Sequence, residues 1–358
     1  MLSDGVLSHL RVIADWPDLS GTRYQATRVV GRGGMGTVYL AEDAELRREV
    51  AIKVLNVPDP DGDFSARLKQ EARLLARLEH PNIVPVHDVG TLPDGRVYYA
   101  MKYVRGERLD EWRRRVSSRA AHLRIFQSIC EAVAFAHSRG VIHRDLKPEN
   151  VMVGALGEAL VMDWGVAKIL RADPDDIAAA MEDRSDLPTG PARPEQGVAP
   201  PDRTAQGAVI GTPAYMSPEQ AGGRVDRIDE KTDVYALGAI LYFLLSGRAP
   251  FDGPDAAEVL RRVKEGGAEP LRRLDPRIPR PLESLCGKAM NAAPLSRCET
   301  ALELSEEVAR HLDGLPLAAH RETHGERATR LLSRNRTLVL LIVTYALMRL
   351  GVLIAFGR

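Results

Sequence analysis

The sequence has few cysteines and no net charge, and both shortages exclude classes of protein. Its three cysteines, Cys130, Cys286 and Cys298, are an odd number at wide spacing, and none belongs to a C-x-x-C pair. We therefore expect no cysteine-based metal or redox site, and a reducing compartment suits the chain. The 49 basic residues balance 49 acidic ones. No overall field would attract nucleic acid, so we expect no nucleic acid partner.

Lysine is also scarce, because only eight of the 49 basic residues are lysines. A lysine at the end of an apolar strand, such as Lys53, is therefore hard to explain as an arbitrary surface residue.

The first ten residues lack a basic region followed by an apolar stretch, so we expect no signal peptide. At 358 residues and 44% hydrophobic composition, the chain can bury one large core or two lobes.

Strand patterns occupy the first part of the chain. β-rich stretches bounded by glycine and charged turns predict an antiparallel meander and one later strand, at residues 24–30, 37–40, 50–55 and 97–104. We therefore expect the first lobe to be mostly sheet.

Helical patterns dominate after these strands. Apolar residues at helical spacing predict helices at 64–78, 120–138 and 230–245. The last of these is apolar on nearly every side, as a helix inside a core would be. Between 171 and 208 the periodicity is lost among prolines, glycines and charged residues, which predicts a long mobile surface loop.

A glycine-rich stretch joins the first two predicted strands. It contains Gly31, Arg32, Gly33, Gly34, Met35 and Gly36. Because it lies between two strands, its glycines would let a hairpin close over a polyphosphate. A Rossmann nucleotide site would need a helix after the glycines. The pattern alone is weak, since a flexible hairpin turn explains it equally well.

Lys53 and Glu71 form the next candidate pair. Lys53 ends the apolar strand Val50-Ala-Ile-Lys53, where a lysine could simply extend to solvent. Glu71, however, lies on the apolar face of the helix predicted at 64–78. A buried carboxylate that loses its partner costs about 3–5 kcal/mol. We therefore expect a Lys53–Glu71 ion pair that positions Lys53 on the α- and β-phosphates of a nucleotide.

The most specific pattern is His143-Arg-Asp-Leu-Lys-Pro-Glu-Asn150, followed by Asp163-Trp-Gly165. With these residues the chain resembles the eukaryotic-like (Hanks-type) serine/threonine protein kinases of bacteria, from about Thr22 to about Asp313. The resemblance implies an α+β, bilobal protein-kinase fold. A small β-rich N-lobe would span residues 22–104 and a larger, mostly helical C-lobe residues 105–313, with a flexible activation segment at about 171–208. Residues 1–21 would be an N-terminal extension.

The resemblance also assigns roles in phosphoryl transfer from ATP, which needs charge neutralisation more than covalent chemistry. Asp145 is expected to orient the substrate hydroxyl and accept its proton, and Lys147 to steady the γ-phosphate. Asn150 and Asp163 are expected to hold Mg²⁺, or Mn²⁺ in its place, because hard cations prefer oxygen ligands. Lys147 is typical of the serine/threonine branch, so the partners would be protein substrates with Ser or Thr acceptors.

The stretch Gly211-Thr-Pro-Ala-Tyr-Met-Ser-Pro-Glu219 resembles the end of an activation segment. Thr212 would then line the substrate hydroxyl pocket. Arg144 would lie as an unpaired cation beside Asp145 unless this segment supplied an anion. We therefore expect autophosphorylation in the segment, with Thr204 as the leading site. Such regulation would suit bacterial signal transduction.

For the adenine ring, the resemblance implies Met101 as gatekeeper and the backbone of Lys102 to Val104 as the hinge. Val38, Ala51 and Met152 would sandwich the ring. Apolar residues at such positions are more often plain core.

Other residues are expected to hold the scaffold. Glu219 would pair with Arg297, and Asp233 in the helix predicted at 230–245 would hold the backbone of the catalytic loop. Trp164 and Ser217 stand where the family usually has Phe and Ala, and both are expected to leave these roles intact.

A basic linker at 314–336 precedes an apolar run at 337–356 whose one charge is Arg349. The run is long enough to cross a hydrocarbon core of ~30 Å as a helix. Arginines on its N-terminal side predict a single-pass anchor in the cytoplasmic membrane, with the kinase facing the cytoplasm. The alternative is an amphipathic or self-associating tail. Gly351 and Ala355 could bring two helices together in a homodimer.

Two other functions compete with protein phosphorylation. One is a catalytically inactive pseudokinase that serves as a membrane scaffold, which the presence of Lys53, Asp145, Asn150 and Asp163 disfavours. The other is a small-molecule phosphotransferase of the same broad fold. Such enzymes usually lack the combination of the His143–Asn150 and Gly211–Glu219 patterns.

Overall fold

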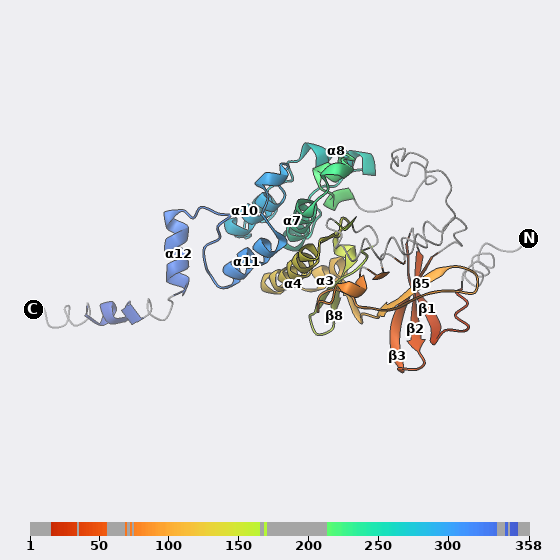
Figure 1. Ribbon diagram of the computed structural model, residues 1–358. Coiled ribbons are helices and arrows are strands. Elements are labelled where there is room, and N and C mark those ends of the chain that lie inside the picture. The colour runs from red at the N-terminus through yellow and green to blue at the C-terminus, as the bar shows by residue number, and fades with distance from the viewer. Residues whose placement is uncertain are drawn as a thin grey trace, which may run out of the picture.

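The structure, a computed structural model, describes residues 16–33, 36–55, 69, 72–73, 75–164, 168–169, 213–334, 341–342 and 344–349. Figure 1 shows a lobe built on a five-stranded sheet beside a larger lobe of helices. Helix α12 (His324–Arg334) lies at the end of the helical lobe that is remote from the sheet. The predicted β-rich N-lobe and helical C-lobe are therefore confirmed.

The N-lobe sheet is antiparallel, with strand order β1-β2-β3-β5-β4. Its strands are β1 (Tyr24–Arg32), β2 (Gly36–Asp43), β3 (Arg48–Leu55), β4 (Val86–Thr91) and β5 (Val97–Lys102). Tyr24, Tyr39, Ile52 and Tyr98 belong to one buried cluster, as expected when one face of a sheet is covered. The predicted meander of the first three strands is confirmed.

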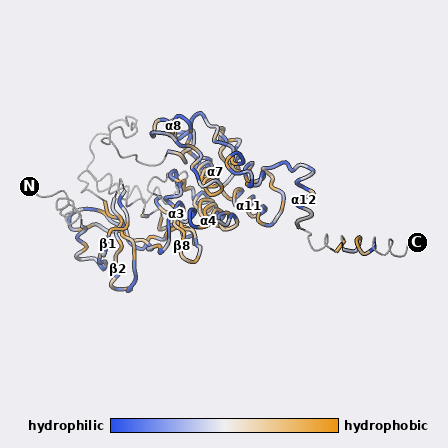
Figure 2. The backbone as a smooth tube through the Cα atoms, turned by 180° about the vertical axis from the view of Figure 1, so that it is seen from behind, coloured by the Kyte–Doolittle hydropathy of each residue, from blue (hydrophilic) through white to orange (hydrophobic). Residues whose placement is uncertain are grey.

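The C-lobe is organised around helix α7 (Glu230–Ser246). Every residue from Thr232 to Leu245 is buried, which explains why the sequence is apolar on nearly every side. Figure 2 shows mostly hydrophobic colours along this helix. Asp229 caps its N-terminus, and Gly247 ends it with a φ of 76°, a left-handed conformation that favours glycine.

Helices α4, α9, α10 and α11 contact α7. Helix α4 (Arg119–Ser138) packs directly against it and starts within one residue of its prediction. The remaining helices are α3 (Leu109–Arg115), α6 (Pro218–Ala221), α8 (Ala256–Glu265), α9 (Leu271–Leu274), α10 (Arg280–Ala289) and α11 (Ala301–Leu312).

Short strands flank the segments that contain His143 to Asn150 and Asp163. They are β6 (Gly106–Arg108), β7 (Val141–Ile142), β8 (Val151–Gly154), β9 (Ala159–Val161) and β10 (Lys168–Ile169). Strands β6, β8 and β9 form one small sheet, and β7 pairs with β10. The His143–Asn150 segment lies between β7 and β8, while Asp163 follows β9. Both segments are therefore held close to strands at their ends.

The chain continues to pack on the C-lobe beyond Asp313, the end of the expected kinase domain. Leu317 is buried, and the buried carboxylate of Glu307 accepts hydrogen bonds from Ala318 N at 3.2 Å and Ala319 N at 3.0 Å. A ring nitrogen of His320 lies 2.9 Å from Ser284 Oγ of α10. The first residues of the predicted 314–336 linker are thus part of the folded lobe.

Several sequence predictions fall wholly or partly outside the described residues. Of the helix expected at 64–78, the described residues between 69 and 77 are helical. The loop expected at 171–208 lies outside the description. Of the run at 337–356, only 341–342 and 344–349 are described. The expected apolar C-terminal helix is not found, because no helix in the described part of the chain is long and apolar enough to cross a membrane.

Candidate active site

Only one of the two carboxylate oxygens of Asp145 is hydrogen-bonded to the described part of the protein. Its Oδ2 accepts hydrogen bonds from Lys147 Nζ at 2.7 Å and Asn150 Nδ2 at 3.0 Å. Oδ1 receives no hydrogen bond from the residues that the structure describes. Because 34% of the side chain is exposed, Oδ1 can accept a hydrogen bond from the hydroxyl group of a ligand.

Asn150 is oriented by the same loop. Its Nδ2 also donates to the Asp145 carbonyl oxygen at 2.8 Å, so the amide nitrogen faces inward. The amide oxygen receives no hydrogen bond from any described residue. An oxygen left in this way is the kind of ligand that a hard divalent cation takes.

Lys53 and Asp163 connect the two lobes. Lys53 Nζ, from β3, lies 3.0 Å from Asp163 Oδ1. Burial by itself would raise the pKa of Asp163. The charge and hydrogen bond of Lys53 act in the opposite direction, and the resulting pKa lies below its ordinary value. Asp163 is therefore an anion at neutral pH. Glu71, the predicted partner of Lys53, lies outside the described residues.

Two site residues have a left-handed backbone that non-glycine residues rarely adopt. The φ of Arg144 is 70° and that of Asp163 is 56°. Such a conformation costs about 1–2 kcal/mol, so the surroundings must impose it. Asp233 accepts hydrogen bonds from His143 N at 2.8 Å and from Arg144 N at 2.9 Å. The predicted role of Asp233 in holding the loop backbone is present.

His143 fastens the segment that carries Asp163. Its Nε2 lies 2.9 Å from the Met162 carbonyl oxygen, while its Nδ1 accepts from Asp145 N at 3.2 Å. In this arrangement Nε2 is the nitrogen that donates and Nδ1 the one that accepts. The ring also packs on Trp164, with centroids 4.6 Å apart. Trp164 therefore fills a buried position beside the catalytic loop.

The carboxylate of Asp233 has a further partner that the sequence did not indicate. His137 Nε2, from α4, lies 2.9 Å from Asp233 Oδ2. Burial would raise the pKa of Asp233, but the hydrogen bond and charge of His137 lower it below its ordinary value. No sequence signal joins these residues, because they are far apart in the chain and meet only when α4 packs on α7.

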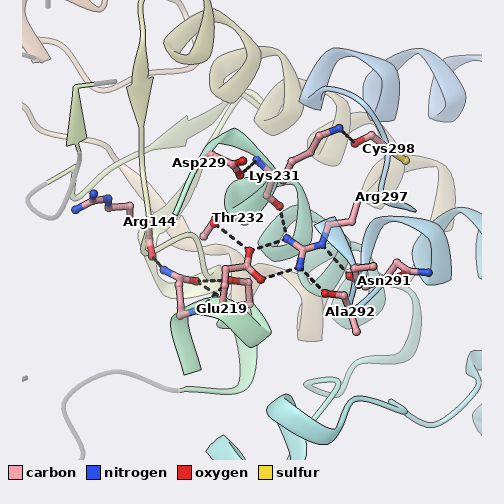
Figure 3. A network of polar contacts seen from close by, with 12 residues as sticks. Arg144, Glu219, Asp229, Lys231, Thr232, Asn291, Ala292, Arg297 and Cys298 are labelled. Carbon is pink, nitrogen blue, oxygen red and sulfur yellow. Dashed lines mark hydrogen bonds and ion pairs between the residues drawn. The ribbon is translucent and has the colours of Figure 1, made fainter. Parts of the chain in front are cut away.

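The predicted Glu219–Arg297 ion pair is present and fully buried (Figure 3). Arg297 Nη1 and Nη2 donate to the two carboxylate oxygens at 2.7 and 2.8 Å. Thr232 Oγ1 adds a third bond at 3.0 Å. Burial would raise the pKa of Glu219, but Arg297 lowers it below its ordinary value. The remaining guanidinium donors reach the carbonyl oxygens of Lys231, Asn291 and Ala292.

Helix α6 ties the end of the activation segment to the catalytic loop. Ser217 and Gln220 form a reciprocal capping box at its N-terminus. Gln220 Nε2 then donates to the Arg144 carbonyl oxygen at 2.6 Å. Sequence reasoning missed Gln220, whereas Ser217 was noted only as a substitution. The S-x-x-Q spacing of a capping box was the available signal.

The residues predicted for adenine gather where the two lobes meet. Met101 and Met152 pack on a cluster that contains Val104 and Leu160. Ala51 stands opposite Met101 in the sheet register, and Val38 stands opposite Lys53. The sheet register thus places Val38 and Ala51 beside the lysine, and the contacts in the cluster bring Met101 and Met152 together.

The described part of the glycine-rich turn is held by close backbone contacts. Gly33 N donates to the Gly36 carbonyl oxygen at 2.9 Å. A Cβ on Gly36 would lie 2.5 Å from the Val54 carbonyl oxygen, so the approach of β2 to β3 itself requires this glycine. A Cβ on Gly31 would meet nothing within 4 Å. Gly34 and Met35 lie outside the described residues, as do Thr204 and Thr212.

Comparison with known proteins agrees with this geometry. Residues 24–308 match the family model of the protein kinase domain. This chain belongs to the protein kinase family. The match covers the N-lobe sheet, the catalytic loop and the C-lobe helices through most of α11. The resemblance drawn from the catalytic-loop residues is therefore confirmed at the level of the family.

Curated bacterial kinases are among the relatives of this kinase domain. It is 34% identical over 310 residues to the serine/threonine-protein kinase PknD of Protochlamydia amoebophila, which covers 81% of this chain and 30% of that protein. It is 35% identical over 292 residues to the serine/threonine-protein kinase PrkC of Bacillus subtilis, covering 80% and 40%. The probable serine/threonine-protein kinase PknB of Bifidobacterium longum is 33% identical over 318 residues, covering 84% and 41%. The chain therefore spans less than half the length of these curated relatives.

Proposed function

We propose that this chain is a serine/threonine protein kinase that transfers the γ-phosphoryl group of Mg·ATP to Ser or Thr hydroxyls of protein substrates. The main observation behind the proposal is that Lys147 and Asn150 bind Oδ2 of Asp145 and leave its Oδ1 available to a substrate. Membership of the kinase family and the names of the bacterial relatives support it. Mg·ATP, when bound, supplies the phosphoryl group and the cationic charge that stabilises its transfer.

Asp145 positions the nucleophile. Its Oδ2 is held by Lys147 and Asn150, which leaves Oδ1 to accept a hydrogen bond from the substrate hydroxyl and then its proton. Lys147 Nζ lies 2.7 Å from Asp145 Oδ2, where its positive charge can stabilise the γ-phosphate during transfer. Because Asp233 and His143 fix the loop from behind, the carboxylate keeps its orientation without substrate.

The donor set fits a nucleotide-bound Mg²⁺. Asp163 contributes a carboxylate that stays ionised and is 53% exposed, and Asn150 contributes an amide oxygen. No group of three or more His, Cys, Asp or Glu suited to a metal occurs in the described part of the chain. That is consistent with Mg²⁺, which usually takes one or two protein oxygens and completes its shell with phosphates and water.

An ATP assay on the purified chain with a generic basic protein tests the proposal, with phosphosites then mapped by mass spectrometry. Phosphate on Ser and Thr is expected, and its transfer should require a divalent cation. Absence of transfer with Mg²⁺ and with Mn²⁺ would instead favour the pseudokinase alternative. Phosphate found mainly on Tyr would refute the assigned specificity.

Autophosphorylation of Thr204 belongs to the same proposal. Arg144 directly precedes Asp145 in the catalytic loop, and a phosphate beside its guanidinium would stabilise the charged form, whose pKa burial lowers. Thr204 precedes Gly211 by a short stretch. Mapping the phosphates of active enzyme checks this, and no phosphate between 171 and 211 would refute the switch.

Attachment to the inner face of the cytoplasmic membrane through 337–356 is proposed from the sequence. Its support includes Leu341, Ile342, Tyr345, Leu347 and Met348, each more than half exposed. Exposed apolar side chains in such a row favour contact with lipid or a second copy of the chain. Fractionation of bacterial cells tests it against a chain ending at 323, which keeps the Leu317 and His320 contacts. Recovery of the full chain in the soluble fraction would contradict the anchor.

A further inference from the structure

A cavity of about 400 Å³ opens in the C-lobe between α7, α10 and the segment that joins α8 to α9. Its wall includes Tyr235 and Tyr242 of α7, with Phe251, Leu271 and Met290. The volume is within the range of cavities that hold small molecules. Pro218 also lines it, so the cavity reaches the base of the buried Glu219–Arg297 pair shown in Figure 3.

The charged side chains that line this C-lobe cavity are all acidic, while the guanidinium of Arg297 lies behind the wall, 5.0 Å from the centroid of the Tyr235 ring. Its lining contains Glu265, Glu269 and Glu283 but no Lys, Arg or His. Glu265 is already paired with Arg261, and Glu283 Oε1 accepts from Arg272 N at 2.8 Å. The carboxylate of Glu269 makes no hydrogen bond or ion pair with any described residue. An anionic ligand would be repelled here, whereas a cation would find one unpaired carboxylate.

Glu269 is held in place through its backbone. Tyr242 Oη donates to the Glu269 carbonyl oxygen at 2.9 Å. Gly266 and Gly267 precede it with φ angles of 71° and 80°, conformations that let the chain turn sharply over the cavity. The rim carboxylate is therefore presented by a fixed turn and not by a freely moving loop end.

A second polar group in the wall has no partner. Tyr235 is 1% exposed and lines the cavity, yet its hydroxyl makes no hydrogen bond with the described residues. The hydroxyl oxygen itself is not among the fully buried atoms of the described residues, so a ligand in the cavity can reach it. Burial also raises the pKa of Tyr235, so the group stays a neutral hydroxyl at physiological pH. It can accept a hydrogen bond from an ammonium group.

We propose that this cavity binds a small organic amine with an apolar, preferably aromatic, body. The body would contact Phe251, Leu271 and Met290, while the ammonium group would meet the Glu269 carboxylate and the ring of Tyr242. Aromatic faces attract cations by about 0.5–2 kcal/mol, and they favour an ammonium over a neutral group of the same size. The site is separate from the catalytic loop and does not depend on phosphoryl transfer.

Three matched probes test the site on the full chain: 2-phenylethylamine, 2-phenylethanol and phenylacetate. In a ligand-observed NMR titration, the amine is expected to bind at least about tenfold more tightly than the alcohol, and the carboxylate is expected not to bind. The kinase-inactive Asp163→Asn chain should bind the amine equally well, which separates this site from the proposed function. Equal binding of amine and alcohol, or no binding of any probe, would overturn the proposal.

Two variants locate the binding. Glu269→Gln keeps the shape of an exposed side chain and should bring amine binding to within about threefold of alcohol binding, while Glu306→Gln on exposed α11 surface is the matched control. Gly287→Leu places a side chain where a Cβ meets nothing within 4 Å, at the wall of the cavity. Leucine also favours helix α10 over glycine, so the variant should fold. Unchanged amine binding in Gly287→Leu would show that the amine binds elsewhere.

Discussion

The charged residues of the catalytic loop and those buried beneath it have opposite relations to solvent. Asp145 and Asp163 keep 34% and 53% of their side chains exposed, and each has carboxylate capacity that the protein leaves available. Glu219 and Arg297 are 5% and 0% exposed, and both are saturated with hydrogen bonds. The first group is arranged for a ligand, whereas the second can only support structure.

The two sets of charges therefore differ in how much each contributes to the free energy of unfolding. A buried ion pair whose partner is lost leaves an uncompensated charge, which destabilises by about 3–5 kcal/mol. An exposed pair is screened by water and contributes about 0–1 kcal/mol. Substitution of the exposed carboxylates should therefore lower activity and leave stability nearly unchanged. Substitution in the buried network should instead lower stability.

The largest expected effect is on activity, at the exposed carboxylates and at Lys53, which is itself buried but pairs with the exposed Asp163. Asp145→Asn, Lys53→Met and Asp163→Asn should each lower the rate of phosphoryl transfer by about 10²–10⁴-fold, because each removes a proton acceptor or a stabilising charge. Thermal unfolding should stay near wild type. Steady-state assays and differential scanning calorimetry measure the two quantities.

Nucleotide binding separates the roles within this site. Asp163→Asn should weaken Mg²⁺-dependent binding of ATP, whereas Asp145→Asn should leave it unchanged, since of these two residues only Asp163 is proposed as a metal ligand. Isothermal titration with and without Mg²⁺ makes the comparison. Undiminished autophosphorylation in the Asp145 variant would remove it from the catalytic assignment.

The next largest effect is on stability in the buried network. Arg297→Met should lower the free energy of unfolding by about 3–5 kcal/mol, because Glu219 is left buried without its countercharge. The double variant Glu219→Gln/Arg297→Met should recover much of this loss. Urea denaturation of the two single variants and the double variant gives the coupling energy. A coupling near zero would contradict the structural role of the pair.

Acid should weaken the buried network. The folded-state pKa values of Glu219 and Asp233 lie below their ordinary values of 4.5 and 3.8. Their stabilisation is therefore fully present above these ordinary values and is lost as the pH falls through them toward the lowered folded-state values. Urea midpoints measured from pH 6 to pH 3 should decline, and less steeply in Glu219→Gln. An identical slope in that variant would refute the contribution of Glu219.

The smallest expected effect concerns the capping box that joins the two regions. Ser217→Ala removes the side-chain acceptor for Gln220 N and should cost about 1 kcal/mol of stability. Ser217→Thr, which keeps the hydroxyl, is the matched control. Activity should fall at most a few-fold, because Gln220 still reaches the Arg144 carbonyl oxygen. A large loss of activity at unchanged stability would place Ser217 with the catalytic residues.

Local sequence patterns were enough for much of the fold. The strand meander and helices α4 and α7 follow from alternation and helical spacing, and their observed bounds lie close to the predicted ones. The family itself followed from the resemblance of the segment His143 to Asn150 and of Asp163 to the pattern of the family. These residues lie close together in the chain, so the resemblance needed no prediction of long-range contacts.

Long-range partners were harder to predict. The Glu219–Arg297 pair and the hold of Asp233 on the loop followed only from resemblance to a family. His137, Thr232 and Gln220 were missed, because a polar residue on a helix looks the same whether it faces water or a distant carboxylate. The packing that extends past Asp313 was missed for the same reason.

The sequence by itself determined which residues can carry the chemistry, since the order Asp145, Lys147, Asn150 and Asp163 is a local property of the chain. Only the tertiary structure decided how they are used. Packing of α4 on α7 brings His137 to Asp233, and the approach of the two lobes brings Lys53 within 3.0 Å of Asp163. The same packing leaves Oδ1 of Asp145 open and the hydroxyl of Tyr235 without a partner. Contacts of this kind depend on distances between elements that no local pattern encodes.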